Sequence, residues 1–93
     1  MIKNPLFSLG QVVATRGALA ALEESGQHPD EFLSRHLSGD WGNVCQEDWQ
    51  ENELALQEGF RLLSAYTTNK GEKLWIITEC DRSITTLLLP DEY

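Results

Sequence analysis

Apolar residues recur at helical spacing in three segments of the first sixty residues. In the first segment, Thr15 is placed to cap a helix that the pattern ends at Gly26. Ala18, Leu19 and Leu22 are predicted to form the apolar side of this helix, because they recur at the spacing of one helical face.

A second helix is predicted to begin at Pro29 and to end at Gly39, because proline suits the first position of a helix and glycine its end. Its apolar face holds four residues: Phe32, Leu33, His36 and Leu37. We expect His36 to be a hydrogen-bonded, half-buried core residue. Turn-forming residues then surround Trp41 and predict a loop.

The third helix is predicted over residues 46–58, with Gly59 as its end. At 100° per residue, three residues share a narrow sector and predict the core-facing side, with Asn52 and Gly59 beside it: Cys45, Trp49 and Leu56. Three carboxylates fall within about 40° of one another on the opposite side: Glu47, Glu51 and Glu58. Leu54 lies in the middle of this acidic stripe.

The last third of the chain changes to β character. Three runs are rich in aromatic and β-branched residues: Phe60–Thr67, Lys73–Glu79 and Ser83–Leu89. Short links join them and predict a three-stranded antiparallel meander. A brief strand is also predicted at 11–14, and whether it joins the meander stays open. Because the strands are apolar on both faces, we expect the second face to meet the N-terminal arm or another subunit.

These elements predict a single α+β domain over residues 1–93. Helices in the N-terminal two-thirds would pack on a C-terminal three-stranded antiparallel β-meander, and residues 1–10 would form an irregular arm whose Phe7 packs on the domain. The chain has 93 residues, of which 41% are apolar and 24% charged, as in one ordinary globular domain. It has no stretch of about 20 apolar residues and no apolar signal core, so we expect a cytoplasmic protein without membrane association.

Charge and cysteine content narrow the possible partners. Fifteen acidic and seven basic residues give a net charge of −8, which argues against direct binding to nucleic-acid phosphates. Cys45 and Cys80 lie 35 residues apart with no second cysteine near either, so we expect two reduced thiols. The ligand spacings of zinc sites, calcium loops and phosphate-binding loops are missing from the sequence, and we expect no metal or cofactor.

The densest run of reactive side chains holds Glu79, Asp81 and Arg82. It could be an acidic pair polarised by the arginine, which would suit a small enzyme. It could equally be a turn in which Asp81 bonds the backbone two residues on and Arg82 pairs with a neighbouring carboxylate. We favour the turn. A separate thiol nucleophile is not expected either, because neither histidine and neither cysteine has a local partner for it.

The acidic middle of the chain is the strongest positive signal. No Lys or Arg occurs between Arg35 and Arg61, an interval with six acidic residues. Such a run is either a solvated face or a surface that presents spaced negative charge to a basic protein. The candidate partner-binding residues are Asp40, Trp41, Glu47, Glu51, Leu54 and Glu58.

Several motifs along the chain resemble a family of small bacterial proteins labelled "plasmid-related protein" or type I restriction–modification subunit. They are Ser8-Leu9-Gly10, Val12 to Thr15, Gly17-Ala18-Leu19, Gly39 to Gly42, Trp75 to Glu79, Asp81-Arg82-Ser83 and Thr85-Thr86 with Leu88 to Pro90, Glu92 and Tyr93. The resemblance implies a bacterial, mobile-element or defence-related setting and assigns no activity.

The sequence therefore favours an acidic, non-enzymatic interaction protein that binds a basic protein, with a nucleic-acid mimic or inhibitor as one form of it. A homodimeric structural or regulatory subunit is the first alternative, since a core of this size would gain from self-association. The small enzyme using Glu79, Asp81 and Arg82 is the second.

Overall fold

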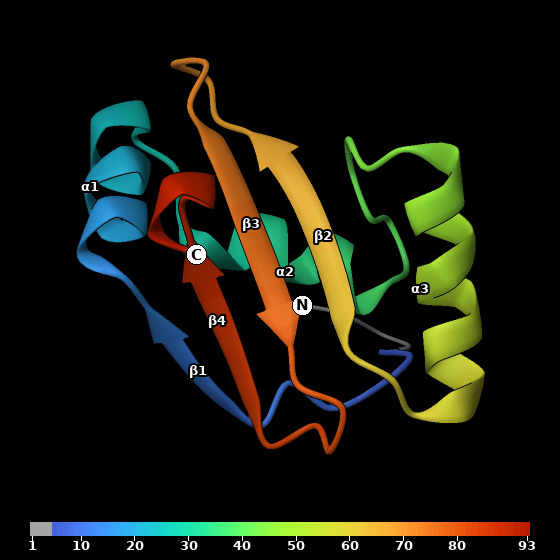
Figure 1. Cartoon of the computed structure of the whole chain (residues 1–93). Helices are drawn as coiled ribbons and strands as arrows, with labels where there is room; N and C mark the ends of the chain where they lie inside the picture. Colours follow the sequence, from blue (N-terminus) through green and yellow to red (C-terminus); the bar gives the residue numbers. More distant parts are fainter. Residues whose placement is uncertain (1–4) are drawn as a thin grey trace.

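A four-stranded mixed sheet and three α-helices form the protein (Figure 1), and the α+β prediction is confirmed. The computed structural model describes residues 5–93; residues 1–4 of the predicted arm lie outside the described part. The elements in chain order are β1 (Gln11–Ala14), α1 (Arg16–Ser25), α2 (Pro29–Leu37), α3 (Gln46–Glu58), β2 (Leu62–Thr67), β3 (Lys73–Thr78), β4 (Ile84–Leu88) and the 3-10 turn η1 (Pro90–Glu92). None of the helices in residues 5–93 is long and apolar enough to cross a membrane.

The strand order is β1-β4-β3-β2, so the prediction of a three-stranded sheet is wrong. Strands β2, β3 and β4 pair antiparallel in succession as predicted, and β1 adds a fourth strand parallel to β4, with Gln11 beside Ile84 and Ala14 beside Leu87. This pairing joins two segments about seventy residues apart, which local patterns do not encode. The helical part is not purely N-terminal either, since η1 follows the last strand.

The C-terminal end of the chain meets the start of α1. Thr15 caps this helix, and its hydroxyl accepts a hydrogen bond from the Ala18 amide at 3.2 Å. The Glu92 carboxylate accepts bonds from the Thr15 hydroxyl (2.5 Å) and the Gly17 amide (3.1 Å), and these bonds lower its pKa. A Cβ on Gly17 would lie 2.6 Å from the Glu92 carboxylate, so a larger residue there would displace the Glu92 side chain.

The core lies between the inner face of the sheet and the helices. One buried cluster consists of Ala18, Leu22, Phe32, Leu33, Tyr66, Leu74, Ile76 and Leu87, and a second of Trp41, Ala55 and Leu62. Phe7 of the arm packs against the second cluster, as predicted, and its ring stacks on Trp41 at 6.3 Å. Leu19 is exposed on α1, so its prediction as a core residue is wrong.

The outer face of the sheet is covered in part by the end of the chain. The ring of Tyr93 packs edge-on against Trp75, with 5.8 Å between centroids, and its hydroxyl accepts a bond from Arg61 at 2.7 Å. Ile77 and Leu88 of this face are buried. Residues 7 and 9 of the arm instead pack on the inner clusters, so for the described part of the arm that alternative is wrong, and contact with another subunit stays a prediction.

A chain of buried polar side chains crosses the inner face. The His36 ring is hydrogen-bonded to the hydroxyls of Ser64 (2.5 Å) and Thr78 (2.9 Å). Thr78 is bonded in turn to Thr85 (2.8 Å), which donates to the Leu9 carbonyl (2.7 Å). Because that carbonyl can only accept, Thr78 donates to Thr85 and the Nε2–H of His36 donates to Thr78. Complete burial favours the neutral ring, in which Nδ1 accepts from Ser64. The prediction of a hydrogen-bonded core histidine is confirmed, but the side chain is fully buried and not half-buried as expected.

Candidate functional site

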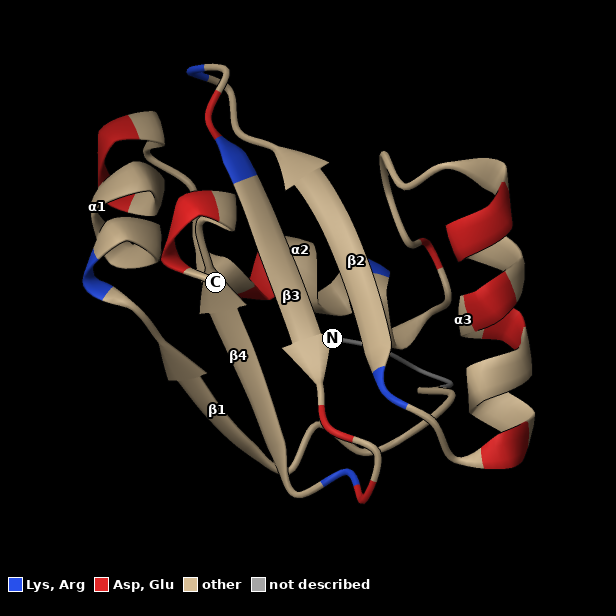
Figure 2. Ribbon diagram, in the orientation of Figure 1, with Lys and Arg blue, Asp and Glu red and all other residues tan. Residues whose placement is uncertain are grey.

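The exposed side of α3 carries several negative charges and no positive one. We call Glu47, Glu51, Leu54 and Glu58 the acidic face of α3; all four are exposed, and Leu54 keeps 51% of its accessible area. Figure 2 shows acidic residues gathered on α3, which contains no Lys or Arg. Within residues 5–93 the Arg35–Asp40 contact is the ion pair between fully charged groups, so no described Lys or Arg lies within 4 Å of an α3 carboxylate, although Arg61 lines a hollow with Asp48 and Glu51.

An asparagine fixes the orientation of α3. The Asn52 amide donates to the Leu63 carbonyl at 2.7 Å and accepts from the Leu63 amide at 3.1 Å, so it occupies the free edge of β2. Asn52 and Ala55 are the buried residues of the helix, and Leu56 is half-buried. The predicted core side is therefore rotated by about 60°.

Two of the residues predicted for the core side of α3 are consequently outside it. Cys45 and Trp49 are both exposed, which corrects the prediction. The physical reason is that two unpaired backbone groups on the edge of β2 need polar partners, and an amide on the helix supplies both. The acidic face nevertheless stays at the surface, because the rotation moves it to the flank of the helix without burying it.

The two hydrogen bonds between Asn52 and Leu63, here called the Asn52 clamp, lead to a prediction about stability. Replacing Asn52→Ala removes two hydrogen bonds at a partly buried site, so we expect the free energy of unfolding to fall by about 2 kcal/mol. Gln50→Ala on the exposed side of the same helix should change it by less than about 0.5 kcal/mol. Urea denaturation of the two variants measures the difference, and equal effects would show that the clamp contributes nothing.

Two of the predicted partner-binding residues belong to the supporting loop. Trp41 is completely buried, and its indole Nε1 donates to Glu53 of α3 at 2.8 Å. Asp40 is half-buried; its carboxylate accepts from Arg35 (2.8 Å) and from the Gly42 amide (3.1 Å), and the Arg35 bond lowers its pKa. Trp41 is therefore a core residue and not the surface contact that was predicted, whereas Asp40, whose side chain is 45% exposed, stays a predicted contact.

The loop is held down because it completes the sheet edge. The Ala65 amide donates to the Trp41 carbonyl at 3.0 Å, and the Asn43 amide donates to the Ala65 carbonyl at 2.6 Å. Between them, a Cβ on Gly42 would collide with the Ala65 carbonyl and the Tyr66 ring. The turn-forming residues around Trp41 predicted the loop correctly, but not that it lies flat on β2 with its tryptophan inside.

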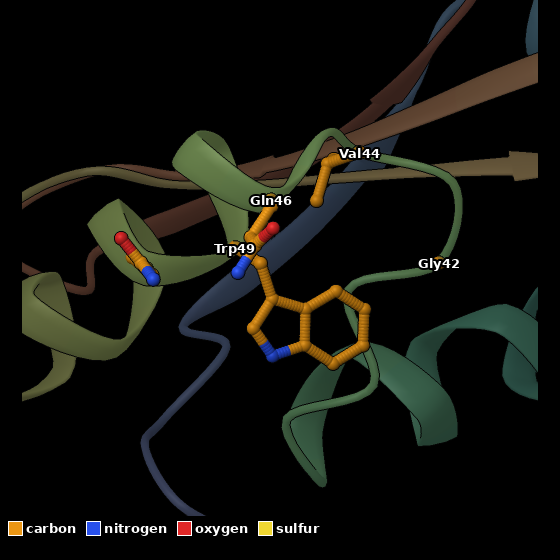
Figure 3. Close-up of a pocket in the computed structure, with 5 residues that line it drawn as sticks. Gly42, Val44, Gln46 and Trp49 are labelled. Carbon is orange, nitrogen blue, oxygen red and sulfur yellow. The ribbon is translucent and has the colours of Figure 1, made fainter.

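An open hollow lies beside the acidic face of α3, between the helix and this loop. It is lined by Gly42, Val44, Gln46, Trp49 and Gln50. Figure 3 shows the indole of Trp49 projecting from α3 into this region. The lining contains no acid, base or nucleophile, so it offers apolar contact and amide hydrogen bonds rather than chemistry. With Phe60, which is also exposed, Trp49 is a surface residue that sequence reasoning missed.

The turn at residues 79–82 is structural. The Arg82 guanidinium donates to the carbonyls of Phe60 (2.7 Å), Ala55 (3.1 Å) and Glu79 (3.1 Å), so it caps the end of α3. Asp81 accepts from the amide (3.0 Å) and hydroxyl (2.6 Å) of Ser83, as the turn interpretation predicted, and these bonds lower its pKa. The predicted pairing of Arg82 with a carboxylate is wrong, and the three side chains do not converge on a shared site.

Other reactive groups in the described part of the chain are dispersed. Among residues 5–93, no group of three or more His, Cys, Asp and Glu side chains is placed to hold a metal ion, and Cys45 and Cys80 are exposed free thiols. Comparisons of the chain with protein-family models, with curated proteins and with solved structures found no match.

Proposed function

We propose that this protein is a non-enzymatic interaction protein that binds a basic protein surface through the acidic face of α3. One observation carries the proposal: three exposed carboxylates and an exposed leucine share one side of a helix that contains no Lys or Arg. Carboxylates at the rim steer a basic partner during encounter, whereas a central apolar side chain is desolvated on docking and slows dissociation.

Neighbouring apolar side chains support the same surface. Trp49 keeps 36% of its area exposed beside the open hollow, and Phe60 is exposed just after α3. A partner that covers the acidic face of α3 could bury these rings as well, and aromatic side chains often dominate the energy of binding.

The spacing of charge on α3 suits a groove that normally binds phosphates. Four of its carboxylates (Glu47, Asp48, Glu51 and Glu58) span about 16 Å of helix axis, or one charge per about 5–6 Å, while Glu53 is turned to the Trp41 indole. One strand of DNA carries a charge every ~3.4 Å. A nucleic-acid mimic in a mobile-element or defence setting, as the resemblance to plasmid-related proteins implies, is therefore the form of this function that we favour.

Capture from a host lysate with matched baits tests the proposal. The test bait carries Glu47→Gln, Glu51→Gln and Glu58→Gln; the control bait carries Glu23→Gln, Glu24→Gln and Glu72→Gln, three exposed carboxylates elsewhere. Both lose three negative charges. At low salt, we expect the wild-type and control baits to capture a basic protein. The test bait should fail to capture it. The same proteins on all three baits would contradict the proposal.

Single substitutions in the acidic face should separate association from dissociation. Glu51→Lys should mainly slow association with the captured protein and flatten its salt dependence, because rim charges steer encounter. Leu54→Ala should mainly speed dissociation and weaken binding by about 1–2 kcal/mol. Stopped-flow or surface-plasmon measurements give both rates. If both variants bind like the wild type, the acidic face is only solvated surface.

A further inference from the structure

The two edge strands of the sheet, β2 and β1, differ in whether other parts of the chain pair with their outer side. Along β2, the Asn52 side chain is hydrogen-bonded to the backbone N–H and C=O of Leu63. The loop at Trp41 and Asn43 is hydrogen-bonded to the N–H and C=O of Ala65. This edge is closed to further strands. Strand β1 forms the opposite edge (Figure 1), and within residues 5–93 it pairs only with β4.

The free side of β1 presents backbone groups that can accept another strand. The amides of Gln11 and Thr15 donate to Ser83 (2.9 Å) and Leu87 (3.0 Å), so they face β4. Because successive backbone groups alternate in direction, the N–H and C=O of Val12 and Ala14 face away from the sheet. Val12 and Val13 remain 42% and 38% exposed. An edge of this kind is a template for pairing with a further strand.

Charge indicates which strand would pair there. In a chain with a net charge of −8, residues 5–22 contain no Asp or Glu and β4 contains no charged residue. Figure 2 shows β1 and β4 free of charge and the acidic α3 beyond the opposite edge. Two copies that meet at β1 would therefore keep their acidic helices at the far ends of the assembly, where repulsion is weakest.

We infer that the protein forms a homodimer in which β1 pairs antiparallel with β1 of a second copy. With the two-fold axis at Val13, Val12 of each copy lies opposite Ala14 of the other. This register uses every outward-facing N–H and C=O of both residues in four hydrogen bonds and makes one eight-stranded sheet. An antiparallel strand pair is self-complementary under a two-fold axis, so β1 of a second copy supplies the donors and acceptors that the first copy needs. The dimer does not depend on the function proposed for α3.

Mass measurement tests the dimer. We expect light scattering at about 100 μM chain and about 0.15 M salt to give twice the 10.5 kDa of one chain. Val13→Lys places two like charges directly opposite one another and should halve that mass. Leu54→Lys changes the charge equally on distant α3 and should leave the mass doubled. Circular dichroism of each variant verifies folding.

Cross-linking tests the register independently of any effect of Val13→Lys on folding. In a chain with Cys45→Ser and Cys80→Ser, Val13→Cys should form an intermolecular disulfide, because non-hydrogen-bonded residues opposite one another lie about 4.5 Å apart at Cα. Val12→Cys faces Ala14 and should cross-link far more slowly. A wild-type mass of one chain would overturn the inference, and so would a dimer that survives Val13→Lys and gives no Val13→Cys disulfide. Neither result would affect capture of a basic protein by α3.

Discussion

Replacing Trp41→Ala should lower the free energy of unfolding by about 3–5 kcal/mol, a large share of the protein's total stability. The side chain is completely buried between Phe7, Ala55 and Leu62 in the second core cluster. Truncating a buried tryptophan costs about 3–5 kcal/mol, and a 93-residue domain has only about 5–14 kcal/mol in total. Urea denaturation followed by far-ultraviolet circular dichroism measures the loss.

Two companion variants identify the cause of the loss. Trp41→Phe keeps much of the apolar contact and should cost clearly less than Trp41→Ala. Glu53→Gln keeps an oxygen that can accept the indole N–H, and should therefore change stability little. If Trp41→Ala instead folds normally and only loses partner binding, Trp41 is a contact residue and its placement in the core is contradicted.

The free energy of unfolding should fall steeply between pH 6.5 and pH 4.5 because of His36. Burial, with a smaller contribution from Arg82, lowers its pKa from 6.5 to about 3. The unfolded chain therefore binds a proton below pH 6.5 that the folded protein does not, and acid favours unfolding. The expected slope is about 1.4 kcal/mol per pH unit, or about 2–3 kcal/mol over this interval.

A His36→Gln variant provides the comparison. Whatever its stability at pH 7, it lacks the titrating ring, so its unfolding free energy should be nearly flat between pH 6.5 and pH 4.5. The lowered pKa values of Asp40, Asp81 and Glu92 reduce stability only at lower pH, where these carboxylates become protonated. Urea titrations at four pH values measure both slopes, and equal slopes in wild type and variant would contradict the neutral, buried His36.

Local signals in the sequence were enough to predict the elements of this fold. Thr15 and Gly26 bound α1, Pro29 begins α2 and Gly59 ends α3, each as its backbone preference requires. The antiparallel meander followed from its short links. The parallel pairing of β1 with β4 and the Glu92 cap on α1 could not be predicted in this way, since both depend on segments about seventy residues apart.

The candidate site was predicted in part for a similar reason. The wheel placed Glu51 and Leu54 on one side of α3, and both are exposed in the structure. It misplaced the core side, because apolar size favoured Trp49 whereas the open edge of β2 selected Asn52. Polar side chains that complete a sheet edge carry no periodic signal, but an asparagine within an apolar sector is a usable warning.

Amide NMR mapping of the surface that binds the captured partner tests the central claim most directly. Adding the unlabelled partner to the ¹⁵N-labelled protein should shift or broaden the amide signals of residues 46–60 and leave those of β1 unchanged. Raising the salt should reverse these changes, because the attraction is electrostatic. Perturbations confined to another surface, with residues 46–60 unaffected, would contradict α3 as the binding helix.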